Sequence, residues 1–525
     1  MYLFIFRMFI YELFAWISCT TIVAGQFVFQ PGNVILRNLV IDNNTGDVFV
    51  GGVNYIYKLN KNLTQLKNVS TPCLVEKCKP GETVNPNANQ LLMIENLTGT
   101  PRLFACGTYK YGICITYDMN SFSYTVLDNT IGAVSNIQNY SSIALEDQSN
   151  NGILIASTRI GDSEQLPTDY TFTAYSGQFV CSGTVKPCIG KSKQILLTSE
   201  SELKIYYILA VIVGKFRYFF NHNMKDGTNV ARLCDKYQIG GDPEIKTYME
   251  IPLRCVGKDG INYEQLVAAK VVRPDGELAE KFGSTGDDDD AVLIGVFQKS
   301  SISSQSALCT YTFKQINEFF WENIVKCFKS NTLPLSKYVK GSTCSVEVPA
   351  ACSLNSRNQK MTGTIKYESE ALVTCSDCGP ISSMDTTSYR GNIIAFLGAK
   401  DGKLSKFVIY SNSSGRRYET SNTIPGSGIL SAKFDRIGEG AYLLSPDKVL
   451  KIPVEECGNR TSCESCVKGG DPYCGWCTLH ATCTTYDKCP YYGSPLGYVR
   501  HSNECISISS LSPSSLPLSE TTIQK

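Results

Sequence analysis

The chain has 525 residues, a formal net charge of +1 and a charged fraction of 18%. This length is enough for one large domain and one small domain. Positive and negative charges nearly cancel, and the sequence contains no basic stripe and no alternation of basic and aromatic residues. These features argue against nucleic acid as a partner.

The first 25 residues have the pattern of a secretory signal peptide. Arg7 precedes the apolar run Met8–Ile22, and the small residues Val23–Gly25 close it. An N-terminal membrane anchor is the alternative, but the apolar run is short and is interrupted by Glu12. Cleavage at this point would remove one of the 23 cysteines, Cys19, and leave 22. An even number in an exported chain predicts that all cysteines are paired.

Acceptor sequences for N-linked glycans agree with export. Seven asparagines stand two residues before Ser or Thr with no intervening proline: Asn43, Asn62, Asn68, Asn96, Asn139, Asn412 and Asn459. Together with a signal peptide, they predict a glycosylated surface.

The region 26–456 consists of short strand-like runs separated by Gly, Asn, Asp and Pro. Predicted strands, rich in β-branched and aromatic residues, are 47–52, 55–59, 103–107, 113–115, 153–156, 205–213, 291–297, 393–398, 402–408, 442–444 and 449–452. The run 205–213 is too short to span a membrane and is expected to be a buried strand. Helix is expected only around Tyr263–Ala269 and Phe313–Ile324. The pattern indicates an all-β fold.

Pairs of strands recur along this region. The runs FVGGVNYIYKLN, FACGTYKYGICI, FLGAKDGKLSKFVI and LLSPDKVLKIPV each contain an apolar strand, a turn and a second strand. Repetition over hundreds of residues predicts a β-propeller, here with seven blades of roughly 60 residues. A pair of β-sandwiches is the alternative on periodicity alone.

Residues 457–505 form a separate cysteine-rich segment. They contain eight cysteines and too few apolar residues for a core, so a disulfide framework or a metal must stabilise the segment. Eight cysteines allow 105 pairings, and the sequence alone selects none of them. Residues 506–525 are rich in Ser, Pro and Leu and are expected to be a disordered tail.

Two sets of motifs carry a family resemblance. The run Gly470–Cys477 (GDPYCGWC), preceded by Cys463-x-x-Cys466, resembles a PSI domain, the small knot of plexins, semaphorins and integrins. The larger region resembles a sema domain of the plexin type through VFVGGVNYIYKLNKNL, ACGTYKYGIC, RLC, IPLRC, DDDDAVLIGVF and SALC. The resemblance implies a seven-bladed propeller over 26–456 followed by a PSI domain over 457–505. The semaphorin-type motif CPYDP does not occur.

The resemblance also implies a pairing of the cysteines. The implied pairs are Cys73–Cys78, Cys106–Cys114, Cys234–Cys352, Cys255–Cys309, Cys327–Cys344, Cys457–Cys474, Cys463–Cys505, Cys466–Cys483 and Cys477–Cys489. Proximity in the sequence further suggests Cys181–Cys188 and Cys375–Cys378.

Catalytic and metal-binding motifs are weak or missing in the sequence. Three C-x-x-C pairs could bind zinc, but the exported context favours disulfides. The run Asp287–Asp290 lacks the ligand spacing of a calcium loop and is expected to be a solvated loop. His222, His480 and His501 stand in no recognisable catalytic motif. We therefore expect no enzyme, no cofactor and no metal.

Similarity to plexins implies recognition without chemistry. We expect the ligand-binding head of a plexin-like receptor, which binds the sema domain of a semaphorin through its own propeller and has cell-surface co-receptors as further partners. No transmembrane segment is expected, so the chain would be a secreted decoy, or the extracellular part of a longer plasma-membrane receptor. The alternative is a secreted semaphorin-like ligand or adhesion protein.

Overall fold

The computed structural model describes residues 27–71, 86–97, 99–109, 112–126, 134–135, 141–148, 152–157, 170–174, 193–196, 205–223, 227–234, 248–287, 289–300, 302–330, 361–435, 440–490, 492–494 and 497–505. The chain divides into two compact units between Val454 and Glu455. None of the helices within these residues is both long and apolar enough to cross a membrane.

The larger unit contains seven sheets, which are mostly antiparallel meanders. In chain order, the first three sheets are β2 (Leu36–Ile41), β3 (Val48–Gly52), β4 (Tyr55–Leu59) and β5 (Gln65–Ser70); β6 (Asn89–Glu95), β7 (Arg102–Gly107), β8 (Cys114–Asp118) and β9 (Tyr124–Val126); and β10 (Ser142–Asp147), β11 (Gly152–Ser157), β12 (Tyr170–Ala174) and β13 (Lys193–Leu196).

The next three sheets are β14 (Ile205–Val213), β15 (Phe216–Asn223), β16 (Gly227–Cys234), β17 (Met249–Val256) and β18 (Asn262–Tyr263); β19 (Gln265–Val272), β20 (Val292–Gln298), β21 (Ser306–Thr312) and β24 (Val373–Cys375); and β25 (Ile381–Tyr389), β26 (Asn392–Ala399), β27 (Lys403–Ser411) and β28 (Ser414–Asn422). The seventh sheet combines β29 (Ser431–Phe434), β30 (Gly440–Leu444) and β31 (Val449–Pro453) with β1 (Phe27–Phe29).

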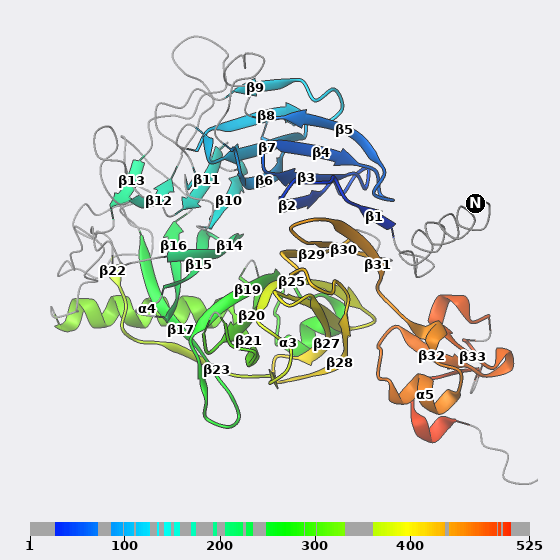
Figure 1. Cartoon of the computed structure of the whole chain (residues 1–525). Helices are drawn as coiled ribbons and strands as arrows, with labels where there is room; N and C mark the ends of the chain where they lie inside the picture. The colour runs from blue at the N-terminus through cyan, green and yellow to red at the C-terminus, as the bar shows by residue number, and fades with distance from the viewer. Residues whose placement is uncertain are drawn as a thin grey trace, which may run out of the picture. The chain divides into compact units, whose positions relative to one another are not determined.

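The seven sheets follow one another around a common centre (Figure 1). Each first strand contacts the first strand of the next sheet from β2 round to β29, and β30 returns to β2. This is a seven-bladed β-propeller, as the strand pairs and the family resemblance predicted. The alternative of two β-sandwiches is therefore wrong.

Hydrophobic clusters fill the seams between the blades. Phe49 and Ile56 of the first blade pack with Leu103 and Tyr117 of the second blade. Similar clusters join the second blade to the third, the third to the fourth, the fourth to the fifth, the fifth to the sixth, and the seventh to the first. Because both faces of a blade pack against neighbouring blades, the sequences of the inner strands are nearly continuous runs of apolar residues.

A buried ion pair crosses the seam between the third and fourth blades. Arg217 Nε on β15 donates to Asp147 Oδ2 at the end of β10 over 2.6 Å. The side chains are 0% and 2% exposed, and Arg217 Nη1 also donates to the Cys234 carbonyl. Two charges so deeply buried are tolerated because each is paired and hydrogen-bonded.

A long insertion follows β21. It contains α4 (Phe313–Ser330), β22 (Met361–Thr362) and β23 (Tyr367–Glu370), and both strands pair in parallel with β17 of the fourth blade. Four apolar residues at helical spacing form the buried face of α4: Phe313, Ile316, Phe320 and Ile324. The helix expected over 313–324 is therefore confirmed, and it continues to Ser330. A second short helix, α3 (Gly276–Phe282), was not predicted.

The helix expected around Tyr263–Ala269 is wrong. Tyr263 ends β18, and residues 265–269 lie in β19, the innermost strand of the fifth blade. Leu266 and Ala268 are buried there, and β19 pairs with β20 through a bulge between them. The ladder with β20 overrides a local composition that is compatible with a helix.

The ring closes through β1, which adds the outermost strand to the seventh blade. Phe27, Val28 and Phe29 pair antiparallel with Lys451, Leu450 and Val449 of β31. Phe29 is buried, and its ring lies 5.1 Å from the ring of Tyr57 on the first blade. The N-terminal strand therefore completes the last blade and also packs against the first blade.

The smaller unit, from Glu455 onward, is held by its cysteines. It contains the helix α5 (Cys463–Lys468) and a three-stranded sheet of β33 (Thr482–Thr485), β32 (Cys474–Cys477) and β34 (Tyr498–Val499). Ser462 caps α5 through a capping box with Ser465. The core of this unit consists largely of cystine sulfur, with Cys457, Cys466, Cys474 and Cys483 in one cluster.

We predict that Phe29→Ala weakens ring closure. The substitution removes a buried ring from the seam between the seventh and first blades, and we expect a loss of about 3 kcal/mol in the free energy of unfolding. The matched control is Val28→Ala on the same strand, where the side chain is 51% exposed, with an expected change below about 0.5 kcal/mol. Urea midpoints measure both; equal midpoints for the two variants would contradict the closure role of Phe29.

Candidate recognition surface

Strand alternation divides the connections of the propeller into two sets. In an antiparallel meander, consecutive turns lie at opposite ends of the strands. Turns that join the first strand to the second, or the third to the fourth, therefore share one face, which we call the hairpin face. Turns that join the second strand to the third, and connections between blades, share the opposite face, which we call the linker face.

The predicted glycan acceptors are distributed unequally between the two faces. Asn43, Asn62, Asn96 and Asn412 lie in the β2–β3, β4–β5, β6–β7 and β27–β28 turns, all on the hairpin face, and all are exposed. Asn68 is exposed on the outermost strand β5, and Asn459 is exposed in the smaller unit. Asn139 lies outside the described residues; in chain order it precedes β10, in a connection between blades.

The linker face carries exposed aliphatic side chains. Ile35 precedes β2, Ile302 lies between β20 and β21, and Leu430 precedes β29; they are 55%, 85% and 38% exposed. None of the sequon asparagines in the described connections lies on this face.

Two disulfides stabilise connections on the linker face. Cys106–Cys114 joins paired residues of β7 and β8 on either side of their turn, and Cys375–Cys378 lies in the connection from β24 to β25. Short disulfide-closed loops have few alternative conformations. They therefore present a preformed surface, which lowers the ordering cost of binding.

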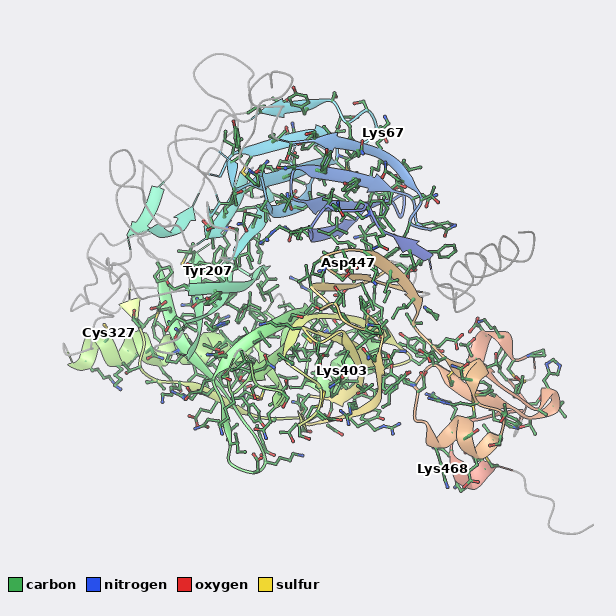
Figure 2. All side chains as sticks on the ribbon, viewed as in Figure 1. Lys67, Tyr207, Cys327, Lys403, Asp447 and Lys468 are labelled. Carbon is green, nitrogen blue, oxygen red and sulfur yellow. A yellow bond between two sulfur atoms is a disulfide. The ribbon has the colours of Figure 1, made fainter. Side chains whose placement is uncertain are left out.

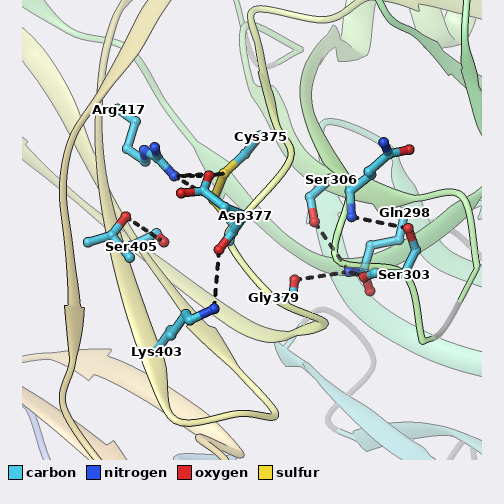
Figure 3. The surroundings of a disulfide bond; sticks show 12 residues. Gln298, Ser303, Ser306, Cys375, Asp377, Gly379, Lys403, Ser405 and Arg417 are labelled. Carbon is cyan, nitrogen blue, oxygen red and sulfur yellow. Dashed lines mark hydrogen bonds and ion pairs between the residues drawn. A yellow bond between two sulfur atoms is a disulfide. The ribbon is translucent and has the colours of Figure 1, made fainter.

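The Cys375–Cys378 loop is also held by hydrogen bonds to both adjacent blades (Figure 3). Arg417 of β28 donates to Asp377 over 2.5 Å and lies 3.1 Å from Cys375 Sγ. Gln298 of β20 donates to the Gly379 carbonyl over 3.4 Å. The hydrogen bond from Arg417 keeps the pKa of the Asp377 carboxyl below its ordinary value. Since both sulfurs are in a disulfide, this loop offers no thiolate for a metal.

Further disulfides lie between blades and in the smaller unit. Cys255–Cys309 joins β17 of the fourth blade to β21 of the fifth. The smaller unit contains four bonds, Cys457–Cys474, Cys463–Cys505, Cys466–Cys483 and Cys477–Cys489. Each of these bonds joins the two cysteines that the family resemblance paired.

Other predicted pairs lie partly or wholly outside the described residues. Cys234 and Cys327 are disulfide-bonded, but their predicted partners Cys352 and Cys344 are outside the described ranges. The same holds for both members of the predicted pairs Cys73–Cys78 and Cys181–Cys188.

The carboxylates of the acidic run ahead of β20 accept hydrogen bonds from neighbouring residues. Asp290 Oδ2 accepts hydrogen bonds from the backbone amides of Thr285 and Asp287, and Asp289 accepts one from Asn317. Asp288 is outside the described residues. These bonds use the carboxylates to shape the loop on the hairpin face.

The three histidines do not come together. His480 and His501 are exposed in the smaller unit, whereas His222 is buried on β15 of the propeller. His222 Nδ1 lies 2.6 Å from the Leu266 carbonyl, and its ring stacks on Tyr206 at 5.1 Å. Burial lowers the pKa of His222 below its ordinary value.

A central channel of about 760 Å³ opens inside the ring and is lined by the first strands of all seven blades. Tyr207 of β14 is one of its lining residues (Figure 2). Ile35, Leu430 and Pro446, from connections of the linker face, also line it. Sequence reasoning missed this feature because each strand contributes only a few residues to it.

Comparison with known proteins finds similarity in both units. The Sema domain model matches residues 268–378, and the Plexin repeat (PSI) model matches residues 456–507. Human Plexin-A2 is 28% identical over 92% of this chain, and zebrafish (Danio rerio) Plexin-A4 is 26% identical over 93%. The chain spans 28% of the length of each of these relatives.

Solved structures share the fold. The extracellular region of Plexin A4 superposes with a TM-score of 0.71 and 24% identity, over 91% of this chain and 52% of that chain. Drosophila Semaphorin 2a gives a TM-score of 0.63 with 16% identity, over 88% of this chain and 80% of that chain. A structure of Drosophila Plexin A in complex with Semaphorin 1b gives a TM-score of 0.60 with 14% identity, over 90% of this chain and 95% of the matched chain. The predicted resemblance to plexins is confirmed: the chain carries a sema propeller and a PSI domain.

We predict that the buried His222 makes the protein less stable in mild acid. Because the pKa of His222 is lower in the folded state than its ordinary value of 6.5, the unfolded state binds more protons as the pH falls below that value, and the free energy of unfolding decreases. We expect the contribution of His222 to reach at most about 1.4 kcal/mol per pH unit. The melting temperature of His222→Gln should therefore depend less on pH than that of the wild type, whereas the exposed control His480→Gln should behave like the wild type.

Proposed function

We propose that this chain is the ligand-binding head of a plexin-like receptor, and that it binds the sema domain of a semaphorin with the linker face of its propeller. The sema and PSI units and the similarity to plexins over nine-tenths of the chain support this proposal. One similar structure is of Drosophila Plexin A in complex with Semaphorin 1b, so a sema propeller of this fold takes part in a plexin–semaphorin complex. Such a head would act outside the cell, as the sensor of a longer receptor or as a secreted decoy.

The single observation that selects the linker face is the placement of the sequons. An N-linked glycan is bulky and solvated, so a surface that carries several of them is poorly suited to close protein contact. Four exposed acceptors lie on the hairpin face, whereas one sequon, that of Asn139, precedes β10 in a connection that belongs by chain order to the linker face. The linker face presents the aliphatic residues Ile35, Ile302 and Leu430 and the disulfide-closed loops instead. A mixed polar and apolar surface of this kind suits a non-obligate interface.

A secreted semaphorin-like ligand is the second candidate, because Drosophila Semaphorin 2a shares the fold. Two measurements separate it from the receptor proposal. A receptor head should bind semaphorin ectodomains in a surface plasmon resonance panel. A semaphorin-like ligand should instead bind plexin ectodomains, and homodimerise in sedimentation experiments.

Engineered glycans test the linker face directly. Ser304→Asn creates the sequon Asn-Gln-Ser in the exposed β20–β21 turn, and Pro425→Asn creates Asn-Gly-Ser in the exposed connection before β29. A glycan on the binding face should weaken semaphorin binding by at least about tenfold, because it blocks close contact. Mass spectrometry verifies that each site is occupied.

The matched control lies on the other face of the same blade. Gly283→Asn creates Asn-Ser-Thr on the hairpin face just after α3, at a φ of 68° that asparagine tolerates and where an added Cβ meets no atom within 4 Å. This variant should bind like the wild type. If both linker-face variants bind normally and the control does not, the choice of face is wrong, although the protein remains a semaphorin receptor. If no semaphorin binds the unmodified chain, the proposed function itself is wrong.

A further inference from the structure

The central channel has the dimensions of a ligand site. Its volume of about 760 Å³ lies within the range of small-molecule pockets. Its wall combines apolar side chains such as Ile143, Leu209 and Val267 with polar side chains from the first strand of every blade. Polar groups placed in a concave site can fix the orientation of a small ligand.

The charged side chains of the lining are all cationic. They are Arg37 on β2, Lys270 on β19 and Lys433 on β29. Behind them, the buried Asp385 of β25 pairs with Lys270, with Oδ1 and Nζ 2.6 Å apart, and accepts a hydrogen bond from the Phe434 amide over 2.9 Å. Cations on a low-dielectric wall concentrate a positive potential inside the channel.

Lys433 has no ion pair or hydrogen bond among the residues that the structure describes, although it lies within electrostatic range of Asp385. Asp385 forms its ion pair with Lys270 instead. Burial lowers the pKa of the half-buried Lys433, Asp385 partly offsets this effect, and the charge of Lys270 adds to it. An anion in the channel would restore a favourable environment for this charge.

We propose that the central channel binds a small oxyanion, such as a phosphate, sulfate or carboxylate compound, through Lys433 and Lys270. The two lysines come from blades on either side of the β25 blade and both line the channel. An anion beside Lys433 would accept a hydrogen bond from its ammonium group. The ion pair with Asp385 holds the ammonium group of Lys270 in place as the second contact. The channel shares Ile35 and Leu430 with the linker face, but Lys270 and Lys433 are not part of the protein contact proposed above, so either proposal can fail without the other.

Calorimetry on the full chain tests the site, with inorganic phosphate, sulfate and citrate as separate probes at equal ionic strength. We expect saturable binding of at least one probe. Lys433→Met should weaken it by at least about tenfold, the usual scale for a lost charge-assisted hydrogen bond. Lys433→Arg should retain it. The matched control is Lys448→Met on the same blade, which removes a lysine that is paired with Asp447 and lies outside the channel lining.

Chemical labelling of the wild type keeps the test valid if Lys433→Met fails to fold. An amine-acetylating reagent should modify Lys433 more slowly when the bound probe is present, and should modify Lys448 at an unchanged rate, as read by peptide mass spectrometry. The proposal is overturned if all three probes fail to bind. Equal affinity of wild type and Lys433→Met, or equal protection of both lysines, would also overturn it.

Discussion

The propeller depends on one long-range pairing, the antiparallel ladder between β1 and β31. It joins residues 27–29 to residues 449–451, the two ends of the larger unit. Closing so long a loop carries a large entropic cost, and the ladder alone has only three pairs. The packing of Phe29 in the cluster with Tyr57 and Tyr442 adds burial to these pairs. Without β1, the outer edge of β31 would be unpaired, and exposed edges invite non-native pairing.

Closure of the ring has two consequences for recognition. It places the first strands of all seven blades around one channel, and it fixes which turns share a face. The blade seams then hold the two faces rigid, through apolar clusters and through the buried Arg217–Asp147 pair. A rigid ring presents its loops with little ordering cost, which agrees with the binding role proposed above. The disulfides extend this rigidity to individual loops of the linker face.

Prediction from the sequence succeeded where a signal was local. The runs 47–52 and 55–59 contain β3 and β4, and the helix expected around 313–324 forms the first two-thirds of α4. The run 205–213 is the strand β14, but it is only partly buried, because its side chains line the channel. The helix expected around Tyr263–Ala269 failed because β20 and β21 complete a ladder there that local composition does not reveal.

By itself, the sequence determined the all-β class, the cysteine-rich second unit, the plexin-like motifs and the positions of the glycan acceptors. All of these depend on residue type and spacing along the chain. The tertiary structure alone decided that Asn43, Asn62, Asn96 and Asn412 share one face, and that Arg37, Lys270 and Lys433 line one channel. These groupings join residues tens to hundreds of positions apart. They arise from strand direction and ring closure, which only the folded chain establishes.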